Sequence, residues 1–190
     1  MRSDYWLYFD NPLADTWCDR IVEYAMGAYE PVDATIGFEN NRPDETYRKC
    51  DIRWMDASIE KDIVNDIWHI ANRANRDSFD LDLRYVNEIQ YTTYYGNDET
   101  PGRYDWHHDV HWTEPKAHHR KLSLVFQLSD PSEYEGGRFE FDPNLPQLPD
   151  EAFKKGSVIV FPSVHTHRVT PVTAGTRHSL VTWVEGPHWR

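Results

Sequence analysis

The chain has 190 residues and a formal net charge of −12 at pH 7. A negative field of that size repels phosphate backbones, so nucleic acid is expected neither as a substrate nor as a partner. With 39% hydrophobic and 14% aromatic residues, the composition is typical of a globular protein and not of a disordered one. The length predicts one domain that spans residues 1–190.

Segments that would direct the chain to a membrane are not expected. Residues 1–10 have no apolar core behind a basic flank, and no run of about 18 apolar residues occurs in the sequence. Cys18 and Cys50 are too few for a disulfide framework, although a single bridge stays open. A reducing cytoplasm is therefore the expected location, and the oligomeric state stays undefined.

Two amphipathic helices are predicted before residue 83. Apolar residues recur at helical spacing at Trp17, Ile21, Val22, Ala25 and Ala28, and again at Ile59, Ile63, Ile67, Ile70 and Ala74. Asp15 or Thr16 is available to cap the first helix, and the second is expected to start after Asp56 or Ser58. Both stripes predict helices that pack on a sheet, and neither carries chemistry.

Strands are predicted from about residue 83 onward. The segments rich in β-branched, aromatic and other apolar residues are 86–95, 122–128, 138–141 and 157–161. Segments 167–172 and 178–184 are expected to form a strand pair that turns at residues 173–175. Residues 97–102 and 143–149 are expected to be loops.

This order of elements predicts an α+β fold, in which short strands with Gly and Pro turns form a sandwich or a barrel. Residues 1–82 are expected to be mainly helical support, and residues 83–190 to form the β core with the metal site. The role of residues 30–55 is undefined, although 35–54 is a candidate lid or substrate-binding strand.

The tripeptide His107-His108-Asp109 is a candidate metal-binding motif. In an extended segment His107 and Asp109 share one face, and His108 should point away. With a distal His167 they would make two imidazoles and one carboxylate, the arrangement of non-heme Fe(II) oxygenases, which leaves coordination positions open. Taken alone, the tripeptide favours a surface His/Asp cluster over a metal site, because such short motifs often occur by chance.

Other histidines compete for the same role. His165 lies two residues before His167 and is an alternative distal ligand. His111 is an alternative partner for His107 in a zinc-like cluster.

The residues around the second histidine carry a family resemblance. The segment 161–172 reads FPSVHTHRVTPV, and Gly175-Thr176-Arg177-His178-Ser179 follows it. Together with His107-His108-Asp109, this pattern resembles the Fe(II)/2-oxoglutarate-dependent dioxygenases, and within them the prolyl-4-hydroxylase-like branch. Segments 134–137 and 156–162 also resemble that family, so that the resemblance covers roughly residues 91–185.

The resemblance implies a double-stranded β-helix (jelly-roll) core with the N-terminal helices packed on one side. It implies that His107, Asp109 and His167 are the iron ligands. It assigns cofactor binding to Arg177, Ser179 and Tyr94: the guanidinium would grip the far carboxylate of 2-oxoglutarate, and the two hydroxyls would hydrogen-bond the co-substrate. Tyr91 and Tyr95 are close competitors for the tyrosine role.

The activity that the resemblance implies is hydroxylation of an unactivated C–H bond with Fe(II), 2-oxoglutarate and O2, with ascorbate as a candidate reductant. The expected substrate is a prolyl residue in a peptide or protein, and the alternative is a free amino acid or another small molecule. A non-catalytic jelly-roll module that binds a metal or ligand is a second hypothesis, and a closed zinc site with four protein ligands would support it. An oxygenase acting on nucleobases is disfavoured by the charge of −12.

Three residues are candidates for substrate binding. Trp106 and Trp112 flank the motif and could wall a pocket, because such pockets are mainly apolar. Arg138 follows Gly136-Gly137, at a place where relatives often carry an acidic residue, and this departure leaves the substrate preference open. Phe126 and Trp183 are expected to belong to the core.

Overall fold

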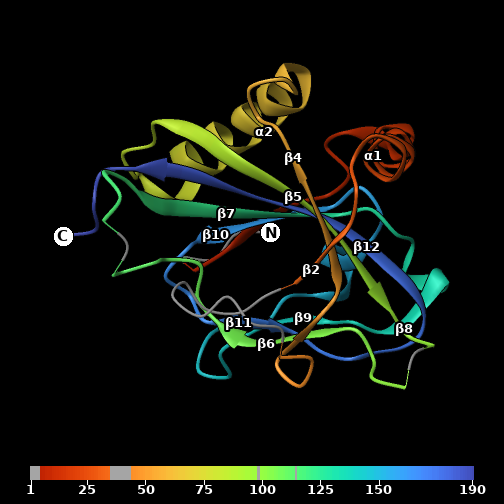
Figure 1. Cartoon of the computed structure of the whole chain (residues 1–190). Coiled ribbons are helices and arrows are strands. Elements are labelled where there is room, and N and C mark those ends of the chain that lie inside the picture. The colour runs from red at the N-terminus through yellow and green to blue at the C-terminus, as the bar shows by residue number, and fades with distance from the viewer. Residues whose placement is uncertain (1–4, 35–43, 98, 114) are drawn as a thin grey trace.

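A computed structural model describes the chain except for residues 1–4, 35–43, 98 and 114. Two β-sheets face each other, and two helices cover the outer surface of the larger sheet (Figure 1). The helices are α1 (Ala14–Ala28) and α2 (Lys61–Ala74). This layering is the double-stranded β-helix with helices on one side that the resemblance implied.

The larger sheet has the strand order β1-β10-β7-β12-β5-β4-β2 within the described residues, and β8 pairs with β12. Its strands are β1 (Leu7–Phe9), β2 (Val32–Asp33), β4 (Asp51–Met55), β5 (Tyr85–Tyr95), β7 (His119–Gln127), β8 (Tyr134–Gly136), β10 (Val158–Pro162) and β12 (Val172–Gly186). The smaller sheet has the order β3-β6-β11-β9. Its strands are β3 (Arg48–Lys49), β6 (Arg103–His107), β9 (Phe139–Phe141) and β11 (His167–Val169).

Both predicted helices are present, and most residues of the stripes that predicted them are buried against the larger sheet, whereas Ala28 and Ile59 are exposed. The ring centroids of Trp17 on α1 and Phe126 on β7 lie 5.5 Å apart. Ile67 on α2 is fully buried in the same core. Burying one such side chain contributes roughly 1.5–3 kcal/mol, so this layer holds the helices on the sheet.

The expected helix starts were wrong in detail. Helix α1 begins at Ala14 without a side-chain cap, so that Asp15 lies inside its first turn. Helix α2 begins at Lys61, and Ile59 precedes it and is 68% exposed. Asp56 accepts hydrogen bonds from the backbone N–H and the hydroxyl of Ser58, which closes a turn before the helix starts.

Four of the predicted strands appear as β5, β7, β9 and β10, but the expected hairpin of 167–172 and 178–184 was wrong. The first segment forms β11, which pairs with β6 and β9 in the smaller sheet. The second belongs to β12, which starts at Val172 and pairs with β5 and β7 in the larger sheet. Pro171 lies between them and has no N–H to continue a ladder. The chain therefore changes sheets there.

Residues 173–175 are part of β12 and not a hairpin turn. They pair with β8 across an irregular register, and Gly175 has a φ of 71°, a conformation that glycine adopts without strain. This bulge lets one strand run on toward the cavity residues.

The first 82 residues supply more than helices. β1 pairs with β10, β3 pairs with β6, and β4 pairs with β5, so these short strands extend both sheets. Residues 35–43 of the candidate lid lie outside the described residues, and residues 48–49 and 51–55 are the strands β3 and β4.

The two faces of the larger sheet have different tasks. Leu124 and Phe126 on β7 belong to the core beneath the helices, whereas Val125 belongs to the core between the sheets. Because side chains alternate along a strand, every second residue of β7 and β12 faces the space between the sheets. Among the described residues, no helix is long and apolar enough to cross a membrane.

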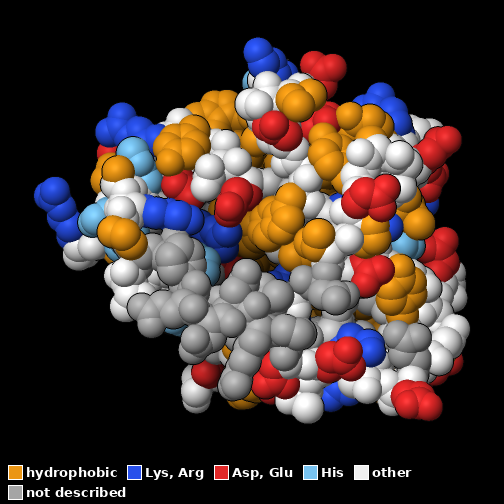
Figure 2. All heavy atoms as spheres, in the orientation of Figure 1, with side chains coloured by type: hydrophobic (Ala, Val, Ile, Leu, Met, Phe, Trp, Pro, Cys, Tyr) orange, Lys and Arg blue, Asp and Glu red, His pale blue; other side chains and the backbone are white. Residues whose placement is uncertain are grey.

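Charged side chains on the outside are mostly acidic. In Figure 2 acidic side chains are scattered over the visible face, whereas a group of basic side chains gathers beside an apolar patch near its centre. This part of the surface is therefore basic, although the net charge of the chain is −12.

Candidate active site

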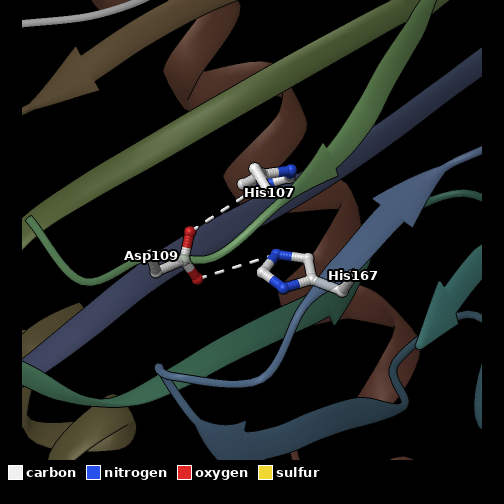
Figure 3. Close-up of side chains that lie close together, drawn as sticks. All are labelled: His107, Asp109 and His167. Carbon is white, nitrogen blue, oxygen red and sulfur yellow. Dashed lines mark ion pairs between the residues drawn. The ribbon is translucent and has the colours of Figure 1, made fainter. Parts of the chain in front are cut away.

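His107, Asp109 and His167 lie together between the sheets (Figure 3). His107 ends β6 and His167 begins β11, and the two are direct partners in the ladder of these strands. Their ring centroids are therefore only 4.2 Å apart. Asp109 follows β6, and its backbone N–H donates to the carbonyl of Ser163 at 2.9 Å, which fixes the turn.

The ligand atoms of this group converge. Nε2 of His107 lies 3.7 Å from Oδ1 of Asp109, and Nε2 of His167 lies 3.7 Å from Oδ2. The three ligand atoms all lie within 4.8 Å of one another. Among the described residues, this is the group of His, Cys, Asp or Glu side chains that could hold a metal ion. Two imidazole nitrogens and a carboxylate around one point are a donor set that suits a divalent transition metal.

Hydrogen bonds outside the group orient its members. Nδ1 of His107 lies 2.7 Å from the carbonyl oxygen of Asp105, and Nδ1 of His167 lies 2.9 Å from that of His165. A carbonyl can only accept, so each Nδ1 carries the proton and each Nε2 keeps its lone pair for a metal.

The carboxylate is held by two serines. The hydroxyl of Ser123 on β7 donates to Oδ2 of Asp109 at 2.6 Å. The hydroxyl of Ser163 lies 2.9 Å from that of Ser123 and can donate to it in turn. This short relay ties the ligand group to the larger sheet.

The electrostatics keep the group ready for a cation. Burial, followed by the neighbouring His167, lowers the pKa of His107 to about 3. The pKa of the Asp109 carboxyl lies well below its usual range: burial opposes this, but His167, His107, Arg120 and the Ser123 hydrogen bond outweigh it. At neutral pH His107 is thus neutral and Asp109 charged, the protonation states that metal binding requires.

The competing histidines lie outside the group. His165 packs its ring against Tyr5 with centroids 5.8 Å apart, and its backbone carbonyl is the part that contacts His167. His111 lies 3.3 Å from Nη1 of Arg120. His108 is exposed and packs edge-on against Trp112.

A cavity of about 580 Å³ opens beside the three residues and is lined from both sheets. Arg177, Ser179, Val181 and Trp183 all line it, which follows from their alternate positions along β12. Trp183 is buried, as expected, and also contributes to this wall, whereas Phe126 packs under the helices.

Arg177 is the most deeply buried cation of the cavity. It is 1% exposed, and its Nη2 donates to Oε1 of Gln127 at 2.9 Å. Its Nε and Nη1 are buried and have no hydrogen-bond partner among the described residues. Unpaired buried donors on a charged group are costly, so the site fits an anionic ligand.

Tyr94 lies beside this arginine and also lines the cavity. The guanidinium carbon of Arg177 is 5.5 Å from the centroid of the Tyr94 ring. The competing tyrosines are engaged elsewhere: the Tyr91 hydroxyl lies 2.7 Å from Nδ1 of His178, and the Tyr95 hydroxyl donates to Asp51 at 3.1 Å.

The three candidate substrate residues do not line the cavity. The ring of Trp106 lies under the guanidinium of Arg168 at 4.5 Å, and Trp112 is 53% exposed. Arg138 forms an ion pair with Asp150 at 2.9 Å. Trp106 and His107 are neighbours on β6 and point to opposite faces of the strand, so proximity along the chain did not place Trp106 in the pocket.

Other cavity residues were not anticipated from the sequence. They include Arg48, Glu88, Gln90, Tyr104 and Arg120. Tyr104 had a local signal, since it lies three residues before His107 and its ring stacks on that histidine with centroids 3.5 Å apart. The others reach the cavity from strands that only the tertiary pairing brings together.

Comparison with known proteins agrees with this geometry. The 2OG-Fe(II) oxygenase superfamily model matches residues 89–185, more than half of the chain, and the chain belongs to that family. Fe(II), 2-oxoglutarate and O2 are the metal and co-substrates of this family.

Curated relatives match the chain over shorter segments. A PKHD-type hydroxylase of Synechococcus sp. (strain CC9311) is 36% identical over 87 residues, which are 46% of this chain and 38% of that protein. A PKHD-type hydroxylase of Hyphomonas neptunium (strain ATCC 15444) is 38% identical over 64 residues, or 34% of this chain and 28% of that protein. The matched part is thus well under half the length of these relatives.

Solved structures share the fold over nearly the whole chain. A Pseudomonas putida prolyl-4-hydroxylase has a TM-score of 0.68 at 18% identity, covering 96% of this chain and 93% of that one. A prolyl hydroxylase from Trichoplax adhaerens, solved with a hypoxia inducible factor oxygen degradation domain peptide fragment, has a TM-score of 0.73 at 15% identity and covers 96% and 84%. At these identities the likeness establishes the fold alone.

Proposed function

We propose that residues 1–190 form one dioxygenase domain that hydroxylates an unactivated C–H bond, that of a prolyl residue in a peptide or protein. The observation that carries this proposal is the pairing of two sites in one cavity. One is the group of two histidines and a carboxylate, and the other is a buried arginine with unpaired donors.

Iron is the metal that we assign to His107, Asp109 and His167. Three ligands on one side leave room for co-substrate and oxygen, whereas a structural zinc site is closed by a fourth protein ligand. Bound Fe(II), supplied with 2-oxoglutarate and O2, provides the oxidising power for C–H hydroxylation, with succinate and CO2 as by-products.

The co-substrate is assigned to Arg177, Ser179 and Tyr94. The guanidinium of Arg177 offers Nε and Nη1 to the far carboxylate of 2-oxoglutarate, because Gln127 occupies only Nη2. Ser179 is two residues further on β12, so its hydroxyl faces the same cavity. The Tyr94 hydroxyl can donate to the same carboxylate, since burial, its largest influence, keeps the phenol protonated by raising its pKa.

The prolyl substrate rests on the relatives. The curated relatives are named PKHD-type hydroxylases, and the structural neighbours include prolyl hydroxylases, one of them with a peptide fragment bound. Tyr104 and Trp183 offer aromatic walls to such a ring. A free amino acid or another small molecule is the alternative substrate.

The test is succinate formation from 2-oxoglutarate by the Fe(II)-loaded protein in air, with and without ascorbate and proline-containing peptides. We expect slow turnover alone and faster turnover with a peptide. No turnover under any of these conditions would contradict the proposal. Metal analysis of anaerobically purified protein separates it from the non-catalytic module, which would hold a four-ligand zinc instead.

A cytoplasmic location is part of the proposal. Cys18 and Cys50 are both buried and neither forms a disulfide, which supports a reducing compartment.

A further inference from the structure

Arg48 lies inside the cavity, next to the proposed metal ligands. It begins β3, and its partner in the ladder is Tyr104 on β6. The guanidinium carbon lies 4.2 Å from the centroid of the Tyr104 ring, and that ring stacks on His107. A single aromatic ring therefore separates this cation from a metal ligand.

The charge of Arg48 is buried and has no carboxylate partner among the described residues. The side chain is 9% exposed; Nη2 donates to Oε1 of Gln90 at 3.2 Å, and Nε has no hydrogen-bond partner in the part of the chain that the structure describes. The thiol of Cys50 and the phenols of Tyr94 and Tyr104 also interact with it. Burial, the largest influence, raises the pKa of each of these three groups, so that they stay neutral. A guanidinium is always protonated, and a buried charge without a counter-ion is costly.

Two other cavity arginines already have anions assigned. Arg120 forms an ion pair with Glu88, and Arg177 has the co-substrate carboxylate in the proposed function. Arg48 is therefore the arginine of the cavity wall to which no anion has been assigned. Its guanidinium is held in place by the Tyr104 ring and by the hydrogen bond to Gln90.

We propose that Arg48 binds a carboxylate of the substrate, so that the substrate class is a prolyl or related compound with an acidic group close to the oxidised carbon. This inference rests on the proposed function and adds the charge of the substrate to it. A planar guanidinium grips a carboxylate through paired N–H groups, which positions the neighbouring carbon as well as binding it. The carboxylate can be the C-terminus of a peptide or free imino acid, or the side chain of an adjacent acidic residue.

The test measures binding under anaerobic conditions to the protein loaded with Fe(II) and 2-oxoglutarate. The first pair of probes is N-acetyl-Ala-Pro with a free carboxylate and its C-terminal amide. The second is N-acetyl-Ala-Pro-Asp-amide and the same peptide with Asn. We expect the acidic member of one pair to bind about 30-fold more tightly than its neutral partner, the cost typical of unpairing a buried charge. The pair that shows the preference identifies the source of the carboxylate.

Arg48→Gln should abolish that preference, and Arg48→Lys should keep part of it. Arg53→Gln is the matched control, because Arg53 is another buried arginine with an unpaired nitrogen, on the neighbouring strand β4, but it does not line the cavity. The control should lose stability and keep the preference.

Equal binding of both members in both pairs, or no binding of any probe, overturns the inference. So does a preference that survives in Arg48→Gln, or a loss of 2-oxoglutarate affinity in that variant without any change in probe discrimination. If Arg48→Gln does not fold, the preference for the acidic probe is compared between the natural protein and Arg48→Lys. A preference that is equally strong in both then overturns the inference. A natural protein that fails to bind 2-oxoglutarate contradicts the proposed function instead, so the two failures are distinguishable.

Discussion

In His107 and in His167, Nδ1 hydrogen-bonds a backbone carbonyl and Nε2 points toward the carboxylate of Asp109. His167→Ala removes one of the three proposed ligand atoms and should weaken Fe(II) binding by more than the roughly 10- to 100-fold that loss of an outer hydrogen bond costs. Anaerobic metal titration measures this effect.

His165→Ala is the matched control, since His165 contacts His167 through its backbone carbonyl, which alanine keeps. The control should bind Fe(II) as the natural protein does. The reverse result, with binding lost in His165→Ala and kept in His167→Ala, would show that the distal ligand is misassigned.

Arg177 is the residue that we assign to the far carboxylate of 2-oxoglutarate. Arg177→Ala should raise the apparent KM for 2-oxoglutarate about 30-fold or more, because it leaves a carboxylate unpaired in a buried site. Arg138→Ala, which removes an exposed ion pair away from the cavity, should leave this KM unchanged. An unchanged requirement in Arg177→Ala would remove its assigned role.

Local spacing explains how much of the site the sequence predicts. His107 and Asp109 sit two apart on one extended segment, and Arg177 and Ser179 sit two apart on another, so period-two alternation puts each pair on one face. Arg48 has no such companion. Its place in the cavity depends on the pairing of β3 with β6, which no local pattern encodes.

Among the elements, strand β7 connects the group of His107, Asp109 and His167 to the larger sheet. Its residues Ser123, Val125 and Gln127 alternate toward the interior, where Ser123 holds Asp109 and Gln127 holds Arg177. One strand thus supports both proposed binding groups.

Ser123→Ala removes the hydroxyl that donates to Asp109 and should weaken Fe(II) binding about 10- to 100-fold. Ser157→Ala is the control, because Ser157 is also fully buried but its hydroxyl donates to the backbone of Glu151. Equal metal affinities in the two variants, at comparable thermal stability, would argue against a positioning role for Ser123.

The strands also show where prediction from sequence failed. Solid apolar runs such as 157–161 were identified because a buried strand needs them. The segments beside Pro171 were assigned to one hairpin because proline and glycine also punctuate turns. Sheet membership follows from the partner strands, so the separation of β11 from β12 was not visible locally.

At the scale of the molecule, histidines buried in neutral form link stability to pH. Burial, followed by Arg53 and Arg177, lowers the pKa of His178 from 6.5 to about 4. As the pH falls, the unfolded chain protonates His178 near pH 6.5, before the folded protein does so near pH 4. The free energy of unfolding therefore decreases as the pH falls from 6.5 toward 4.

For the metal-free protein, His178 should account for about 2 kcal/mol of lost unfolding free energy between pH 7.5 and pH 5. Urea unfolding measures this loss, and His178→Gln should show a smaller pH dependence than the natural protein. The exposed His69 serves as the control, and His69→Gln should keep the full dependence. An identical slope in all three proteins would contradict the assignment.

The proposed iron centre and the proposed 2-oxoglutarate site share one cavity of the double-stranded β-helix. A crystal structure grown anaerobically with Fe(II) and 2-oxoglutarate tests it most directly. We expect the metal on Nε2 of His107, Nε2 of His167 and the carboxylate of Asp109, with the far carboxylate of 2-oxoglutarate on Arg177. A metal closed by a fourth protein ligand such as His111, or 2-oxoglutarate bound away from Arg177, would contradict it.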